Sequence, residues 1–237
     1  MEEFLHEVDD AFGITLSPSQ VKMFIAYEDV LIKWNKKFNL TSITDHNTIL
    51  IKHFFDSLSC LHIIPKQGDF SLIDIGTGAG FPGIPLRIIN PSIKLTVSDS
   101  VGKKVDFCRK VVEELALTNT QVLKNRAEII GQDENYRERF DWAVARAVAP
   151  LPVLAEYLLP LIHIGGFMLA QKGGSMDKEI DQSGNAIKIL GGKLDTLKPI
   201  SLPFGMGERT LISIRKIKPT PAKYPRRPGI PKKNPLV

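Results

Sequence analysis

The sequence predicts an α/β fold in which a mostly parallel sheet follows a helical N-terminal segment. From about residue 70 onward, short runs rich in β-branched residues alternate with stretches of helical length, which is typical of parallel strands joined by helices. A glycine-rich turn at residues 76–83 follows the first run directly, as in sheets that bind a nucleotide at this point. Near the C-terminus, two extended runs are separated by a loop too short for a helix, and this predicts an antiparallel pair at the sheet edge.

Composition places the chain among globular proteins. Its 237 residues, 43% hydrophobic and 24% charged, suit one large domain or a domain with a small helical extension, and exclude wholesale disorder, coiled coil and collagen. No apolar run approaches the roughly 18–20 residues that cross a bilayer, and the acidic N-terminus is unlike a signal peptide. Cys60 and Cys108 cannot build a disulfide framework, and neither has a partner at metal-ligand spacing. We therefore expect a cytoplasmic, metal-free protein.

The first 60 or so residues are predicted to be helical. Ser17 stands at an N-cap position, a proline follows at the first helical position, and Gln20 lies three residues after the cap, which is the pattern of a capping box. A further helix is expected over residues 48–61. Within it, His53 and Asp56 are three positions apart and could form a local hydrogen-bonded pair.

The remaining elements follow from the alternation. Strands are expected at residues 71–75, 94–98, 120–123, 142–145 and 167–171, and the terminal antiparallel pair at residues 193–202 and 210–217. Helices are expected at residues 82–89, 103–117 and 152–161.

Asp74 lies near the end of the first strand, just before the glycine-rich turn. Its negative charge helps to distinguish a dinucleotide from a nucleoside ligand without phosphate groups. Gly78, Gly80 and Gly83 match the dinucleotide fingerprint formally, but a carboxylate at this point would repel a pyrophosphate. It would attract an ammonium group such as that of S-adenosylmethionine, which carries no phosphate. The antiparallel edge pair is also unexpected in a dinucleotide-binding half-domain. A tight turn that simply needs glycine remains the alternative.

Asp99 comes about 20 residues after the turn, at the end of the second strand. A carboxylate there accepts hydrogen bonds from ribose hydroxyls with either NAD or S-adenosylmethionine, so it indicates a nucleoside without choosing between them. Asp99 could instead cap the helix at 103–117. Residues 125–128 follow the third strand, where an adenine would be bound.

Positive charge is concentrated at the C-terminus. The net charge is +5, yet residues 215–237 hold eight Lys or Arg, no acidic residue and six of the 16 prolines. Such a segment cannot bury a core, so we expect it to be extended or disordered until it meets a partner. Lys and Arg release counterions from phosphates, which favours RNA or DNA over a membrane; a solubilising tail is the alternative. The residues assigned to RNA binding are Lys218, Lys223, Arg226, Arg227, Lys232 and Lys233.

Several motifs are specific in combination. Residues 74–83, with Phe81 and Pro82 after the third glycine of the turn, carry more information than a bare glycine pattern. The accompanying motifs are residues 38–41, 53–58, 99–104, 125–128, 145–147, 171–173 and 224–231. Over essentially the whole chain they resemble the bacterial family of small-subunit ribosomal RNA methyltransferase G, also called glucose-inhibited division protein B.

The resemblance implies a class I S-adenosylmethionine-dependent methyltransferase. Its fold would be Rossmann-like, a mostly parallel seven-stranded sheet with an antiparallel edge strand and N-terminal helices. We expect a helical extension at residues 1–62, the cofactor-binding domain at 63–217 and the basic tail at 218–237. The implied reaction is methylation of N7 of a guanosine, and the partner would be 16S ribosomal RNA or the 30S subunit. We expect a monomer that works without a metal or a membrane.

The same resemblance assigns the site. Arg146, after the fourth strand, would position the reactants at the rim beside the cofactor; without the resemblance it would be interpreted as part of a surface salt bridge. Because guanine N7 carries a lone pair and no proton, no general base is assigned. The implied packing of the N-terminal helices against the cofactor loop would involve His53 and Asp56. The residues expected to bind the cofactor are Asp74, Gly76, Thr77, Gly78, Gly80, Phe81, Asp99, Ser100, Val101, Ala127, Glu128 and Arg146.

Other functions are weighed against this one. A methyltransferase that modifies a protein or a small molecule gives no reason for the basic tail. A non-catalytic RNA-binding module with a vestigial fold would be expected to have lost Asp74, the glycine turn or Asp99. An NAD-dependent oxidoreductase is the least favoured.

Overall fold

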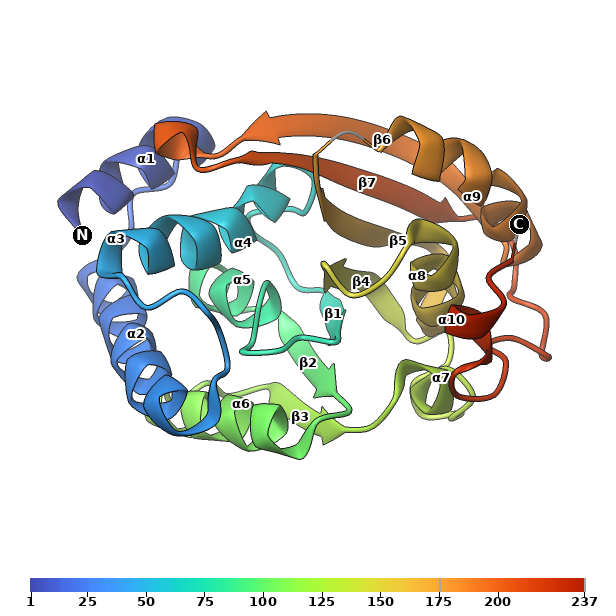
Figure 1. The fold of residues 1–237 in the computed structure, drawn as a ribbon, viewed down its shortest axis with the longest axis horizontal. Helices are drawn as coiled ribbons and strands as arrows, with labels where there is room; N and C mark the ends of the chain where they lie inside the picture. Colours follow the sequence, from blue (N-terminus) through green and yellow to red (C-terminus); the bar gives the residue numbers. More distant parts are fainter. Residues whose placement is uncertain (175, 237) are drawn as a thin grey trace.

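The computed structural model of the protein describes residues 1–174 and 176–236. At its centre lies a seven-stranded sheet with the strand order β3-β2-β1-β4-β5-β7-β6 (Figure 1). Strands β1 to β5 pair in parallel, whereas β7 runs antiparallel to both β5 and β6. The predicted fold class and the antiparallel pair at the edge are therefore confirmed. The strands are β1 (Ser71–Ile75), β2 (Lys94–Asp99), β3 (Thr120–Lys124), β4 (Phe140–Arg146), β5 (Ile162–Gly173), β6 (Gly192–Ser201) and β7 (Glu208–Lys216).

Helices cover both faces of the sheet (Figure 1). Helix α2 begins at the predicted capping box, in which Ser17 and Gln20 exchange side-chain and backbone hydrogen bonds. The helix expected over residues 48–61 is divided into shorter turns, with Leu50–Phe55 in π-helical geometry between α3 and α4. The helices are α1 (Glu2–Phe12), α2 (Pro18–Phe38), α3 (His46–Ile49), α4 (Asp56–Leu58), α5 (Gly83–Ile89), α6 (Gly102–Glu114), α7 (Ala127–Ile130), α8 (Leu151–Leu158), α9 (Asp177–Ile189) and α10 (Ile230–Lys233).

Two hydrophobic cores lie on opposite faces of the sheet. Successive residues of a strand point to opposite faces, and accordingly Leu72 joins one core while Ile73 joins the other. The first core also contains apolar residues of α1, α2, α5 and α6, and the second contains those of α7, α8 and α9. The N-terminal helices thus share a core with the sheet.

The connections between strands place a crevice at the carboxyl ends of β1 and β4. After β1 the chain moves outward to β2 and β3, and then crosses back to form β4 on the other side of β1. Where connections leave neighbouring strands in opposite directions, α/β proteins bind their ligands. The glycine-rich turn follows β1, and Arg146 ends β4, so both lie at this edge.

Helices α7 and α9 were not anticipated from the sequence. Helix α7 has only four residues. Helix α9 is largely polar and carries Ser183 and Gly184 near its middle, two residues that weaken an isolated helix. Ile187 of α9 and the following Leu190 are buried in the second core, so tertiary packing stabilises a segment of low intrinsic propensity. In the described ranges, no helix is long and apolar enough to cross a membrane.

The C-terminal tail is ordered against the domain, which corrects the expectation of a disordered arm. Tyr224 is buried in the second core, and Pro231 is buried as well. Because proline has no N–H, a proline-rich segment leaves carbonyl groups without regular partners. Arg137 and Gln132 supply the missing donors: Arg137 binds the carbonyl oxygens of Thr220 and Tyr224, and Gln132 binds those of Ala222 and Pro225.

Ion pairs also hold the tail. Lys216, fully buried at the end of β7, lies 3.2 Å from Glu138, and burial lowers the pKa of Lys216 to about 8. Arg226 forms a fork with the fully buried carboxylate of Glu156, at 2.9 Å for Nε and 2.6 Å for the terminal nitrogen. The amino-acid composition of the tail did not predict its ordered structure, because the groups that bind the tail lie far away in the sequence. Arg226, one of the residues assigned to RNA binding, is engaged inside the protein.

We predict that Arg226→Ala lowers the free energy of unfolding by about 3 kcal/mol, because it leaves the buried Glu156 carboxylate unpaired. The matched control is Arg109→Ala, which removes an exposed pair with Asp106 and should cost less than about 0.5 kcal/mol. Urea denaturation followed by circular dichroism measures both. A loss for Arg226→Ala as small as that of the control would mean that this ion pair does not hold the tail.

Candidate active site

The turn after β1 contains two glycines at which the backbone lies too close to other side chains for a Cβ atom. Gly76 and Gly80 have φ values of 69° and 87°, in the left-handed region that favours glycine. A Cβ on Gly80 would lie 2.3 Å from the Tyr27 hydroxyl oxygen, and one on Gly76 would lie 2.8 Å from the Val148 side chain. Through the space at Gly80, the Tyr27 hydroxyl donates a hydrogen bond to the Ala79 carbonyl oxygen. Helix α2 is thereby tied to the loop.

Asp74 supports this loop from behind. Its side chain is fully buried, and Oδ2 accepts hydrogen bonds from the Thr77 hydroxyl at 2.7 Å and the Gly83 amide at 2.8 Å. Burial, the largest influence, raises the pKa of this carboxyl to about 6. Asp74 does not line the neighbouring cavity, so the geometry assigns it to the shape of the loop. Asp74 Oδ1 is buried without a hydrogen-bond partner, and its contact with a ligand ammonium group stays a prediction.

The backbone amides of the loop are largely used within the protein. Those of Gly76 and Thr77 donate to the carbonyl oxygen of residue 98, and those of residues 80 and 81 donate to the Thr77 carbonyl oxygen. The Gly78 amide donates to Asp99 Oδ2 at 3.1 Å. A pyrophosphate at the start of a helix needs free amides, so this loop is unsuited to a dinucleotide. It suits a nucleoside ligand without phosphate groups.

Asp99 joins the loop to the end of β2. Oδ2 binds the Gly78 amide, Oδ1 accepts a hydrogen bond from the Val101 amide at 2.9 Å, and Lys104 Nζ lies 3.7 Å away. The N-cap of α6 is Val101 and has no side-chain cap, so the alternative that Asp99 caps this helix is wrong. Because a carboxylate offers about four acceptor positions, Asp99 retains capacity for ligand hydroxyls.

A cavity of about 540 Å³ lies at this edge of the sheet, within the range of small-molecule sites. Of the residues expected to bind the cofactor, Asp74 and Gly80 do not line it, and the other ten do. Sequence reasoning did not assign Thr41, Tyr157 and Lys232 to this cavity, although all three line it. Thr41 lies in a motif noted above, whereas Tyr157 carried no sequence signal.

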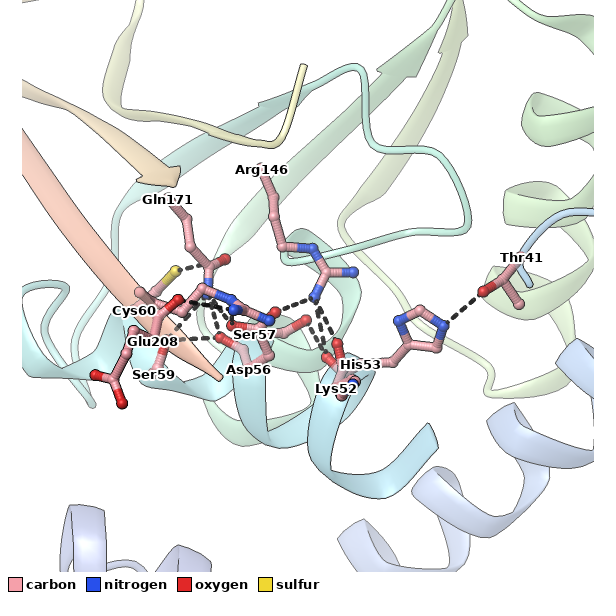
Figure 2. A network of polar contacts seen from close by, with 11 residues as sticks. Thr41, Lys52, His53, Asp56, Ser57, Ser59, Cys60, Arg146, Gln171 and Glu208 are labelled. Atoms are coloured by element: carbon pink, nitrogen blue, oxygen red, sulfur yellow. Dashed lines mark hydrogen bonds and ion pairs between the residues drawn. The ribbon is translucent and has the colours of Figure 1, made fainter. Parts of the chain in front are cut away.

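Arg146 belongs to a charged network on one side of the cavity (Figure 2). One of its terminal nitrogens donates to Asp56 Oδ2 at 3.2 Å and to the carbonyl oxygens of Lys52 and His53. Asp56, whose side chain is 4% exposed, also accepts hydrogen bonds from Arg209 at 3.0 Å and Gln171 at 2.7 Å. The network joins β4, β5, β7 and the N-terminal segment, and it fixes the Arg146 guanidinium at the cavity.

His53 packs on the glycine loop and does not pair with Asp56, so the expected local pair is wrong. Its ring stacks on Phe81 with centroids 4.7 Å apart and an interplanar angle of 12°, and Arg146 Cζ lies 4.9 Å from the same Phe81 ring. His53 Nε2 lies 3.0 Å from the Thr41 hydroxyl oxygen. Burial, followed by the charge of Arg146, lowers the pKa of His53 to about 3. His53 is therefore neutral at physiological pH.

This arrangement fits S-adenosylmethionine. Asp99 and Glu128 place acceptors for a nucleoside along the cavity, the loop amides are closed to phosphate, and Phe81 with Arg146 borders another part of the cavity. Across the described residues, no group of three or more His, Cys, Asp or Glu side chains is arranged to hold a metal ion. The site can bind a nucleoside cofactor and bring a second substrate to its open side.

Comparisons with known proteins agree with this geometry. A family model described as GidB, rRNA small subunit methyltransferase G, matches residues 20–208. The chain is 48% identical to ribosomal RNA small subunit methyltransferase G of Alkaliphilus metalliredigens, with 94% of each chain covered. It is 47% identical to the protein of that name from Acetivibrio thermocellus, over 100% of this chain and 97% of the relative.

Solved structures share the fold at much lower identity. A SAM-dependent methyltransferase from Aquifex aeolicus superposes with a TM-score of 0.52 at 16% identity, covering 72% of this chain and 94% of that one. The fold neighbour supports the class I methyltransferase architecture, and the sequence relatives define the family. The chain belongs to the rRNA small subunit methyltransferase G family of S-adenosylmethionine-dependent methyltransferases.

Proposed function

We propose that this protein transfers a methyl group from S-adenosylmethionine to N7 of a guanosine in 16S ribosomal RNA. The observation that carries the proposal is a nucleoside-sized cavity built from the family's motif residues, with Arg146 held at its side by a buried carboxylate. The match of nearly the whole chain to ribosomal RNA methyltransferases supports RNA as the acceptor.

Different residues along the cavity would bind different parts of the cofactor. Asp99 would accept hydrogen bonds from the ribose hydroxyls, together with the backbone at Ser100 and Val101. Ala127 and Glu128, at the start of α7, would border the adenine. When bound, the cofactor supplies an electrophilic methyl group on a sulfonium centre. Gly76, Thr77, Gly78 and Phe81 would hold the other half of the cofactor, while Asp74 and Gly80 keep the loop in shape.

No proton has to leave the acceptor atom, since guanine N7 presents a free lone pair. The protein therefore has to hold the guanine ring in line, exclude water and tolerate the positive charge that the base acquires. Neutral His53 adds no further positive charge beside Phe81, and Asp56, which Arg146 shares with Arg209, offsets part of the Arg146 charge. Positioning of this kind can contribute roughly 7–11 kcal/mol to lowering a barrier.

The basic tail offers a surface for the RNA backbone. Five of the six residues assigned to RNA are exposed, and Arg226, paired with Glu156, is the exception. The exposed residues are Lys218, Lys223, Arg227, Lys232 and Lys233. RNA with a splayed loop base suits this site better than a duplex, because an unstacked base can enter a cavity. We further propose that the protein acts as a monomer in the cytoplasm, where its ribosomal substrate would be met.

The proposal predicts new 7-methylguanosine at one site of 16S RNA. Purified protein, labelled S-adenosylmethionine and 30S subunits from cells that lack the enzyme are mixed, and the RNA is digested for nucleoside mass spectrometry. Free 16S RNA serves as a second substrate and separates action on the particle from action on naked RNA. Label on a different nucleoside, or no label despite measured cofactor binding, would refute guanine N7 as the acceptor.

Arg146→Ala is expected to lower kcat/KM about 100-fold, since misplacing reactants by about 1 Å has an effect of that size. Its free energy of unfolding should fall by only about 1–2 kcal/mol, because Asp56 keeps Arg209 and Gln171 as partners. Arg209→Ala is the matched control: it removes the other arginine on Asp56 but does not line the cavity, so its activity should stay within about threefold of wild type. Equal activity losses in both variants would contradict a positioning role specific to Arg146.

The tail charges predict the salt dependence of RNA binding. Replacing both Lys223 and Arg227 with alanine should reduce the slope of log K against log salt by about 1.4, at about 0.7 for each phosphate contact to single-stranded RNA. A control that replaces exposed Lys178 and Lys193, on α9 and β6, should leave the slope unchanged. Fluorescence anisotropy with a labelled 16S fragment gives both slopes, and identical slopes for the two double variants would exclude the tail from the RNA interface.

A further inference from the structure

The C-terminal tail reaches the adenine side of the cavity and touches the residue expected there. The Gly229 amide donates a hydrogen bond to Glu128 Oε1 at 2.8 Å. Tyr157 also lines the cavity, and burial, followed by the nearby Glu128 carboxylate, raises the pKa of Tyr157 to about 12. Glu128 is 5% exposed, and one donor to its carboxylate comes from the tail.

A second contact of the tail fixes the neighbouring helix. Arg226 binds Glu156 through its guanidinium and also through its backbone amide, at 2.8 Å. Glu156 directly precedes Tyr157 on α8, and α7, α8 and α10 lie together beside the cavity edge of the sheet (Figure 1). A fork between Arg and carboxylate is a geometrically specific contact. The tail therefore contacts both helices that carry these residues: α7, which carries Glu128, and α8, which carries Tyr157.

The end of the tail also lines the cavity. Lys232 in α10 is among the lining residues, whereas the adjacent Lys233 is not. Both are exposed lysines on the same short helix, so they carry equal charge but differ in their position relative to the cavity. Lys232 thus adds a cationic, partly apolar side chain to the side that Glu128 and Tyr157 form.

We propose that the docked tail forms part of the cofactor site. Gly229 and Arg226 orient Glu128 and Tyr157, and Lys232 covers the base. Affinity and selectivity for the adenine of S-adenosylmethionine therefore depend on docking of the tail. This inference rests on the cofactor assignment and deepens it. The tail then has two roles on two sides, with Arg226, Gly229 and Lys232 directed to the cofactor site and Lys223 and Arg227 directed to RNA.

The physical reason is the preorganisation of a buried carboxylate. A buried acceptor that loses a donor must be resolvated or must find a new partner, and either change turns Glu128 away from its present direction. Binding that must first restore the direction is weaker, because part of the binding free energy is used for ordering. The effect should fall on the nucleobase and leave the amino-acid end of the cofactor untouched.

The test is calorimetric binding of S-adenosylhomocysteine and of S-inosylhomocysteine, which carries a 6-oxo group in place of the adenine amine, to full-length protein and three variants. A chain ending at Pro228 removes Gly229 and Lys232 but keeps Tyr224 and the Arg226–Glu156 pair. Lys232→Ala removes only the lining side chain, and Lys233→Ala is its matched control. Thermal unfolding of each apo variant reports on folding.

We expect the shortened chain to bind S-adenosylhomocysteine about tenfold more weakly and to lose most of its preference for adenine over hypoxanthine. Lys232→Ala should weaken binding about threefold, and Lys233→Ala should bind as wild type does. The proposal is overturned if the shortened chain and Lys232→Ala both bind normally. It is equally overturned if affinity falls while the preference for adenine stays, because the tail would then act only through stability.

The result is separable from the proposed reaction, since no RNA is present. Failure of the wild-type protein to bind S-adenosylhomocysteine would refute the cofactor assignment and this inference together. Normal binding with the expected variant pattern, combined with no methylation of 16S RNA, would refute the acceptor and leave the role of the tail intact.

Discussion

Tyr27 reaches the Ala79 carbonyl oxygen through the space that Gly80 leaves open, and the remaining site geometry depends on this contact. It ties helix α2 to the loop that follows β1. Phe81, one residue beyond Gly80, then stacks against both Tyr27 and His53. The N-terminal segment consequently helps to shape the cavity, because the loop, the aromatic cluster and the first core are one packed unit.

Buried carboxylates hold the segments around the cavity together. Donors match them from the adjacent loop or from distant parts of the chain: Asp74 Oδ2 is bound by the loop, Asp56 by Arg146, Arg209 and Gln171, and Glu156 by Arg226 of the tail. Removing Arg226 leaves the buried Glu156 charge uncompensated, which is far costlier than losing a surface pair, whereas Asp56 keeps a second arginine when Arg146 is removed. These carboxylates therefore fix where β4, β7 and the tail meet, and Arg146 acquires a single direction beside the cavity.

The tail is ordered although its composition is that of a disordered segment. A segment rich in Pro, Lys and Arg has too few apolar residues to form a core. Arg137 and Gln132 nevertheless satisfy its carbonyl groups, Glu156 pairs with Arg226 inside it, and Glu138 pairs with Lys216 just before it. The charges left exposed can then face a polyanion. If the tail binds RNA as proposed, its docking removes the entropy cost of ordering the segment at that step, which favours affinity for a given number of phosphate contacts.

The sequence by itself determined the fold class, the succession of most strands and helices along the chain, the capped start of α2 and most of the residues that line the cavity. These features depend on local periodicity, turn glycines and short motifs. Only the tertiary structure decided that Asp74 lies behind the loop, that His53 binds Thr41 and stacks on Phe81, and that the tail docks beside Glu128. Those outcomes depend on contacts between residues far apart in the chain, such as Arg226 with Glu156 and Gly229 with Glu128. Local sequence carries no record of a partner 70 or 101 positions away.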